Sequence, residues 1–144
     1  INKDEPEKIC GGIGMQSHVD IKVPTIELYG TALEKFLAAG YEVQITELDV
    51  TINYDTNGSF SYADEKETNA DQAKYVGQLM KTILEKNRSR DKNVNPKGVT
   101  SITLWGLYDT ISWRASCSPL LFDTGITDPK ASFYEFINAA KSMG

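Results

Sequence analysis

The sequence predicts an α/β fold made of three successive parallel βα units. Three times along the 144 residues, a short run rich in β-branched residues precedes a stretch with apolar residues at helical spacing. No linker or change of composition separates these units. Parallel strands are normally covered on both faces, yet three strands with three helices leave two bare edges and one bare face. The fold is therefore expected to be incomplete on its own.

The first unit combines a strand over residues 12–18 with a helix over residues 25–39. Pro24 precedes the helix, and Gly40 ends it because glycine readily adopts the left-handed conformation that closes a helix. The apolar side of this helix is predicted to comprise Leu28, Tyr29, Leu33, Phe36 and Leu37.

The second unit begins with a β-branched strand over residues 41–50 that ends in acidic residues. The polar stretch 53–67 after it is too long for a simple turn, and loops of that length tend to be functional. Thr68 and Asp71 have the spacing of a capping box at the start of the next helix. Its apolar positions are Val76, Leu79, Met80, Ile83 and Leu84, and the basic segment 86–92 closes it.

The third unit begins with a strand over residues 99–106, which a long loop containing Trp113, Arg114 and Cys117 follows. Asp128 as cap and Pro129 at the first position predict the start of the last helix. Its predicted apolar side consists of Phe133, Tyr134, Ile137 and Ala140.

Composition excludes several classes of function. The hydrophobic content of 40% and charged content of 24% are those of an ordinary folded protein. A net charge of −5 with interspersed signs argues against a nucleic-acid partner, and no apolar run is long enough to cross a membrane. Cys10 and Cys117 are too few for a zinc or CxxC pattern, so they are either buried thiols or one long-range disulfide. No metal or cofactor is predicted.

Polar and aromatic side chains gather where each predicted strand ends. Reactive residues of βα barrels lie at the carboxyl ends of the strands. Alternation along the second strand predicts that Val43 and Ile45 fill the barrel interior and that Glu47 and Asp49 follow them on the same face. The other chemically interesting positions are Gln16 and His18 on the first strand, Trp105 on the third, and Trp113 and Arg114 soon after it.

The only histidine is predicted to link the two acidic residues. Gln16 and His18 share a face with Gly14, which puts His18 within reach of Asp49 on the neighbouring strand. A carboxylate beside an imidazole fixes its orientation, so His18 can then position Glu47. Each residue alone also has a structural explanation, as a solvated glutamate, a satisfied histidine or a core aromatic. Their convergence at one end of three strands favours a functional site.

These residues resemble glycoside hydrolase family 10, the endo-β-1,4-xylanases. The segments GIGMQSHV, ITELDV, VTSITLWGLYDTISWR and PLLFD occur in the order typical of the family and cover nearly the whole chain. The resemblance implies strands six to eight of a (β/α)8 TIM barrel, with residues 1–144 as the C-terminal part of one catalytic barrel. It also implies a secreted or cell-surface location.

The resemblance assigns a role to each candidate residue. It implies that Glu47 is the catalytic nucleophile and that His18 and Asp49 form the hydrogen-bonded pair that holds it. The implied substrate-binding residues are Gln16 near the scissile bond, Trp105 and Trp113 as flat faces for xylose rings, and Arg114 as a donor to sugar hydroxyls.

The implied reaction is retaining hydrolysis of xylan through a covalent glycosyl-enzyme on Glu47. A second glutamate must act as acid and base, and the resemblance places it in an earlier strand, so this chain alone is predicted to be inactive. Its implied partners are xylan or xylo-oligosaccharide and the N-terminal part of the same barrel, from the same gene or a separate chain. Two alternatives stay open: a non-catalytic xylan-binding remnant, and a related retaining β-glycanase with another β-glycan substrate.

Overall fold

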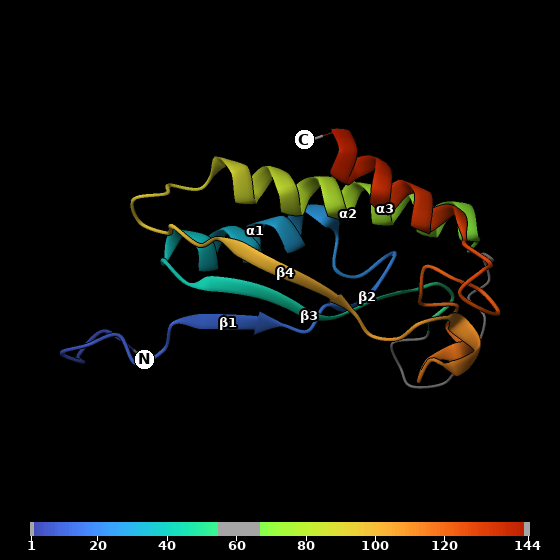
Figure 1. The fold of residues 1–144 in the computed structure, drawn as a ribbon, viewed down its shortest axis with the longest axis horizontal. Helices are drawn as coiled ribbons and strands as arrows, with labels where there is room; N and C mark the ends of the chain where they lie inside the picture. Colours follow the sequence, from blue (N-terminus) through green and yellow to red (C-terminus); the bar gives the residue numbers. More distant parts are fainter. Residues whose placement is uncertain (1, 55–66, 143–144) are drawn as a thin grey trace.

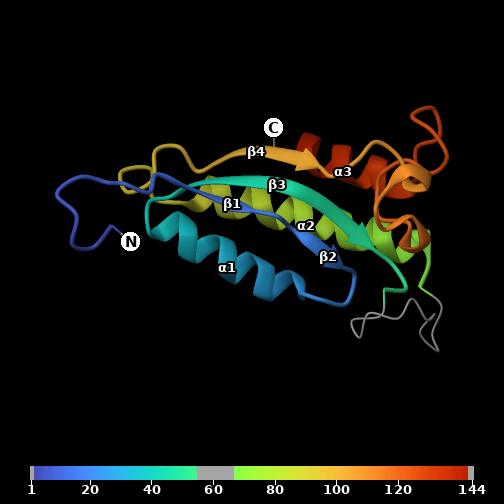
Figure 2. The same ribbon diagram turned by 90° about the horizontal axis from the view of Figure 1, so that it is seen from below.

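The computed structural model describes residues 2–54 and 67–142, which form one parallel sheet with helices on one face (Figures 1 and 2). Strand β3 is central, with β1 and β2 along one side of it and β4 along the other. The elements are β1 (Gly12–Met15), β2 (His18–Asp20), α1 (Ile26–Ala38), β3 (Glu42–Thr51), α2 (Asn69–Ser89), β4 (Val99–Leu104), the 3-10 turns η1 (Asp109–Ile111) and η2 (Ala115–Cys117), and α3 (Ala131–Ser142). The predicted α/β class and the parallel order are confirmed.

The first predicted strand is divided into β1 and β2 by Ser17. This residue has a positive φ of 68°, which breaks the extended backbone between Met15 and His18. Its hydroxyl lies 2.7 Å from the Tyr29 hydroxyl on α1, so the turn is fixed to the helix layer. A continuous strand over residues 12–18 was therefore the wrong prediction at this point.

The first two helices begin where their capping residues predict. The Thr25 side chain accepts from the Leu28 N–H at the start of α1, and Gly40 follows the helix with a φ of +78°. Thr68 and Asp71 form the complete capping box of α2. Leu28 was assigned to the apolar side of α1, but it is 62% exposed. Most of the polar stretch 53–67 lies outside the described residues.

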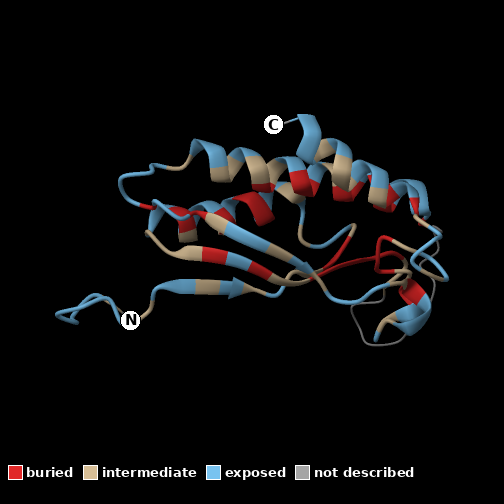
Figure 3. Cartoon of the chain, in the orientation of Figure 1, coloured by how far each residue is buried: buried red, intermediate tan, exposed pale blue. Residues whose placement is uncertain are grey.

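The core lies between the sheet and the helices α1 and α2. Leu33, Val43, Ile45, Leu79 and Ile83 are at most 1% exposed and belong to one apolar cluster. Full burial of such a side chain stabilises the fold by roughly 1.5–3 kcal/mol. Figure 3 shows buried positions along β3, α1 and α2, whereas β1 and β4 are exposed or half-buried. The described residues thus form an open sheet with a single covered face.

The last helix differs from its prediction at the start and in its buried face. α3 begins at Ala131, because Pro129 instead pairs with Phe122 in an isolated antiparallel bridge. The face packed against the core carries Phe133, Phe136 and Ala139, which are partly buried, whereas the predicted Tyr134 is 53% exposed. The assignment of Tyr134 and Ala140 to this face was wrong.

The cysteines and the helix lengths bear on the predictions made from composition. Cys10 and Cys117 are both free thiols, with Cys117 buried and Cys10 half-buried, so the disulfide alternative is not realised. In residues 2–54 and 67–142, no helix is both long enough and apolar enough to span a bilayer.

Candidate active site

The site is built around a β-bulge in the central strand. Met15 pairs with Ile45, and His18 pairs with Asp49, so β3 has one residue more than its neighbour over this interval. The pairing with β4 shifts at the same place, between Ile45 and Leu48. A bulge of this kind bends a strand and re-aims side chains, and it is common next to active sites.

The bulge reverses the alternation of side chains along β3. Val43 and Ile45 before it belong to the core against the helices, and so do Leu48 and Val50 after it. The prediction that Val43 and Ile45 share a face with Glu47 was therefore wrong. The extra residue turns Glu47 toward His18 and away from the helices.

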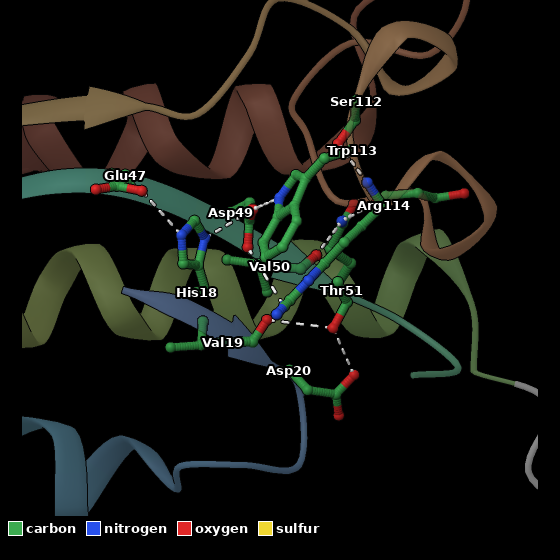
Figure 4. A network of polar contacts seen from close by, with 12 residues as sticks. His18, Val19, Asp20, Glu47, Asp49, Val50, Thr51, Ser112, Trp113 and Arg114 are labelled. Atoms are coloured by element: carbon green, nitrogen blue, oxygen red, sulfur yellow. Dashed lines mark hydrogen bonds and ion pairs between the residues drawn. The ribbon is translucent and has the colours of Figure 1, made fainter. Parts of the chain in front are cut away.

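His18 joins Glu47 and Asp49 of β3, as predicted (Figure 4). Its Nδ1 lies 2.9 Å from Asp49 Oδ2, and its Nε2 lies 3.1 Å from Glu47 Oε2. His18 starts β2, directly opposite Asp49 in the strand pairing, so the backbone register itself sets this contact. We call Glu47, His18 and Asp49 the carboxylate relay.

Both ring nitrogens of His18 face a carboxyl oxygen of β3. A carboxylate accepts hydrogen bonds and an imidazole N–H donates them, so each contact is matched in chemistry as well as in distance. This arrangement holds Glu47 in a single orientation while its side chain keeps 22% exposure.

Asp49 is the buried anchor of the relay. Its side chain is fully buried, and besides His18 it accepts a hydrogen bond of 2.7 Å from Trp113 Nε1 at Oδ2. Asp49 Oδ1 accepts no hydrogen bond within the described residues, but the Arg114 guanidinium lies 3.8 Å from it. A buried carboxylate needs such donors and a counter-charge to stay ionised. These contacts make Asp49 an acceptor fixed from three directions.

The two tryptophans frame His18. The Trp113 ring centroid lies 4.8 Å from that of His18, and the Trp105 centroid lies 6.1 Å from it. Trp105 is 46% and Trp113 58% exposed, so both present a large apolar surface beside the relay. Gln16 is exposed in the break between β1 and β2, and its carbonyl accepts from the Glu47 N–H at 2.9 Å. The structure thus brings these predicted substrate-binding residues to the site.

Arg114 has a geometry that the sequence did not predict. Its guanidinium carbon lies 4.2 Å from the centroid of the Trp113 ring and 4.6 Å from that of Tyr54. With only 15% exposure, its side chain is directed at Asp49 more than at solvent. Tyr54 was missed in the sequence because it belongs to a long polar loop with no pattern.

Two other ionisable groups near the site are insulated from solvent. Burial raises the pKa of Asp20, although the Lys22 N–H and the Thr51 hydroxyl donate to its carboxylate. Burial likewise raises the pKa of the Cys117 thiol, which keeps it protonated at neutral pH. Within the described part of the chain, no group of His, Cys, Asp and Glu has the arrangement of a metal site.

Comparisons with known proteins agree with this geometry. Residues 3–139 match the model of the family described as "Glycosyl hydrolase family 10". The bifunctional endo-1,4-beta-xylanase XylA of Ruminococcus flavefaciens is 38% identical over 130 residues, which are 90% of this chain and 11% of that protein. The chain therefore spans only a small part of this curated relative.

Two solved structures share the fold. A thermostable mutant of a xylanase from Cellvibrio japonicus superposes with a TM-score of 0.72 at 28% identity, covering 92% of this chain and 40% of that one. The endo-1,4-beta-D-xylanase 10B of Clostridium thermocellum, solved with its GH10 module in complex with xylohexaose, gives a TM-score of 0.67 at 32% identity. That match covers 87% of this chain and 22% of the other. The open parallel sheet is thus part of a larger barrel fold.

Proposed function

This chain belongs to glycosyl hydrolase family 10, and on that premise we propose that it is the C-terminal part of the catalytic barrel of a retaining endo-1,4-β-xylanase. In this proposal residues 1–144 supply strands six to eight of the (β/α)8 barrel. The observation that carries it is the imidazole of His18 held between Glu47 and Asp49 at the carboxyl end of the sheet. This is the end at which βα barrels perform chemistry.

Glu47 is the proposed nucleophile. The hydrogen bond from His18 to Oε2 fixes the carboxylate and leaves Oε1 free to attack the anomeric carbon of a sugar. As the bond to Oε1 forms, the glycosidic carbon–oxygen bond breaks, and the leaving oxygen takes a proton from an acid. Water then gives a proton to the residue that served as the acid, attacks the same carbon and releases the Glu47 carboxylate, so that the configuration is retained.

The second carboxyl group of this reaction is proposed to come from outside the chain. A retaining pair needs two carboxyl groups about 5–5.5 Å apart on opposite sides of the scissile bond. Asp49 is on the same strand as Glu47, and its oxygens are engaged by His18, Trp113 and Arg114. The N-terminal part of the same barrel, in the same polypeptide or as a separate chain, is therefore the proposed partner. Alone, this chain is proposed to be inactive.

The exposed aromatic surfaces support a β-1,4-xylan substrate. Pyranose rings present apolar C–H faces with hydroxyl groups at their edges, which suits stacking on Trp105 and Trp113. Gln16 beside Glu47 is placed to contact a sugar near the scissile bond. Arg114 is also proposed to donate to a sugar hydroxyl. Its orientation toward Asp49 supports this contact less than the exposed surfaces of Trp105 and Trp113 support theirs. Because xylan is an extracellular polymer, we also propose that the enzyme is secreted or bound to the cell surface.

Covalent trapping in the intact protein tests the assignment. A 2-deoxy-2-fluoroxylobioside with a dinitrophenyl leaving group does not need acid catalysis to react, and the fluorine slows release of the intermediate. Mass spectrometry of a protease digest should then find the xylobiosyl group on Glu47, and E47Q should stay unlabelled. Label on any other residue would refute the nucleophile assignment. Faster labelling by the matching cellobioside would point to another β-glycan as the substrate.

A further inference from the structure

The segment that carries Trp113 and Arg114 needs an anchor. Residues 105–130 connect β4 to α3, and their regular structure is limited to the two short turns η1 and η2. Segments of this length without secondary structure hold one shape only when specific contacts fix them. Yet the Trp113 indole must stay within hydrogen-bond distance of Asp49 for the relay to keep its geometry.

A buried ion pair supplies such an anchor. Lys130 precedes α3 and is 6% exposed, and Asp109 begins η1 and is 3% exposed. The Lys130 ammonium donates to Asp109 Oδ2 at 2.8 Å, to the Ser118 carbonyl at 2.7 Å and to the Leu120 carbonyl at 2.9 Å. Asp109 Oδ1 in turn accepts from the Leu120 N–H at 2.7 Å. All three ammonium hydrogens are therefore used inside this segment.

The Lys130 ammonium binds both ends of the loop segment 109–118, which carries Trp113 and Arg114. Asp109 lies before Trp113 in the chain and Ser118 lies after Arg114, and both bind the same nitrogen atom. Beyond the anchor, the Ser118 carbonyl also accepts from Gln72 on α2 at 2.6 Å. The two ends of the segment 109–118 are thus held together, and Trp113 and Arg114 between them contact Asp49.

Burial of this pair is costly, which argues that its geometry matters. Burial raises the pKa of Asp109 and lowers that of Lys130, against the opposing effect of their mutual hydrogen bond. Apolar residues often replace buried ion pairs without loss of stability, so stability alone does not explain one. An apolar pair, however, could not bind the Ser118 and Leu120 carbonyls.

We propose that Lys130 and Asp109 are positioning residues that fix Trp113 and Arg114 against Asp49 and thereby keep Glu47 in its reactive orientation. The effect on catalysis rests on the proposed function, whereas the effect on Trp113 does not. Neither residue touches the substrate in this proposal. The Lys130–Asp109 pair fixes Trp113, and Trp113 donates to Asp49. Asp49 in turn holds His18, which orients Glu47.

The test uses K130M in the intact protein, with K97M as the matched control. Lys97 forms an exposed ion pair with Glu42 at the opposite end of the sheet. Hydrogen exchange of the Trp113 indole N–H, assigned by its loss in W113F, should accelerate at least 10-fold in K130M and stay unchanged in K97M. kcat per titrated active site should fall by roughly 10- to 100-fold, because a small misplacement of a reacting group has an effect of this size.

The outcomes separate positioning from mere stabilisation. A lower Tm with unchanged indole exchange and unchanged kcat per active site would overturn the proposal, as would faster exchange without a change in kcat. If the wild-type protein hydrolyses no xylan, the proposed function fails, while indole exchange still decides whether the anchor fixes Trp113. Should K130M not fold, D109N keeps the side-chain shape and removes the charge, and the same two measurements apply.

Discussion

Strand β3 carries one glutamate at its first residue and another in its carboxyl half, and the two have different partners. Glu42 at the amino end binds Lys97, Thr100 and Gln44 on the surface, and these hydrogen bonds, that of Lys97 first, lower its pKa to about 2. Glu47 at the carboxyl end instead faces an imidazole. The comparison shows that the partners, not the residue, make a strand-end carboxylate a candidate nucleophile.

The backbone at the two ends differs as well. The carboxyl end combines the bulge of β3 against both neighbours with the positive φ of Ser17, whereas the amino end keeps a regular register with β1 and shifts only against β4, between Val43 and Gln44. Departures from regular geometry persist where the surroundings enforce them, which is typical of functional sites. We therefore expect substitutions at the carboxyl end to lower the reaction rate and substitutions at the amino end to lower stability.

The largest expected effect is that of E47Q compared with E42Q in the intact protein. Glutamine keeps the shape of glutamate but cannot form the glycosyl-enzyme, so kcat for an aryl xylobioside should fall by about 10⁴-fold or more. E42Q should leave kcat within about 2-fold, because Glu42 contacts only surface groups. Steady-state kinetics measure both. Comparable losses of kcat in E47Q and E42Q would show that Glu47 has no special role compared with Glu42.

Asp49→Asn should have the next largest effect. The amide oxygen would keep the Oδ2 position, where Trp113 Nε1 and His18 contact it, so the amide NH2 would lie beside the Arg114 guanidinium, and the buried negative charge next to His18 would be lost. We expect kcat to fall on the order of 10²- to 10³-fold with little change in KM, as for other carboxylates that orient a catalytic histidine. Asp20→Asn is the control, because Asp20 is also buried at this end but lies outside the relay. A similar loss in D20N would mean that general disruption is responsible.

At the amino end, Asn95→Ala should destabilise the fold without slowing the reaction. Asn95 is 1% exposed; its amide donates to the Leu37 and Tyr41 carbonyls and accepts from the Gly98 N–H. Removal takes a partner from three backbone groups, of which only the Leu37 carbonyl keeps another among the residues that the structure describes, the Gly40 N–H, and this costs about 2–4 kcal/mol. Urea unfolding measures this loss, and exposed Asn93→Ala is the neighbouring control. A fall in kcat of the folded N95A enzyme would contradict the division between the ends.

Local chemistry made much of this fold predictable. Pro24, Gly40 and the Thr68–Asp71 box act within a few residues of themselves, so their patterns located α1 and α2 closely. The meeting of His18 with Asp49 was predictable for a related reason, since residues at the ends of neighbouring parallel strands must lie near each other. The roles assigned to these residues came from the family resemblance and are still predictions.

Features that depend on distant contacts were not predictable. Alternation assumes an even register, so it assigned Val43 and Ile45 to the wrong face once the bulge added a residue. The Asp128-Pro129 pattern predicted too early a helix start, because Pro129 pairs with Phe122. The burial of Lys130 was not predictable either, since nothing adjacent in sequence indicates that Asp109 and two carbonyls surround it.

The smallest expected effect concerns Glu42 itself and depends on pH. Its pKa is lowered from 4.5 to about 2, so its contribution to stability is present above pH 4.5 and is lost as the pH falls toward 2. Lys97→Ala should raise this pKa toward 4.5, though not fully, because Thr100 and Gln44 still donate. The Tm difference between wild type and K97A should therefore be small above pH 4.5 and vanish near pH 2. A carboxyl ¹³C titration measures the pKa directly, and an unchanged value in K97A would show that Lys97 is not its main cause.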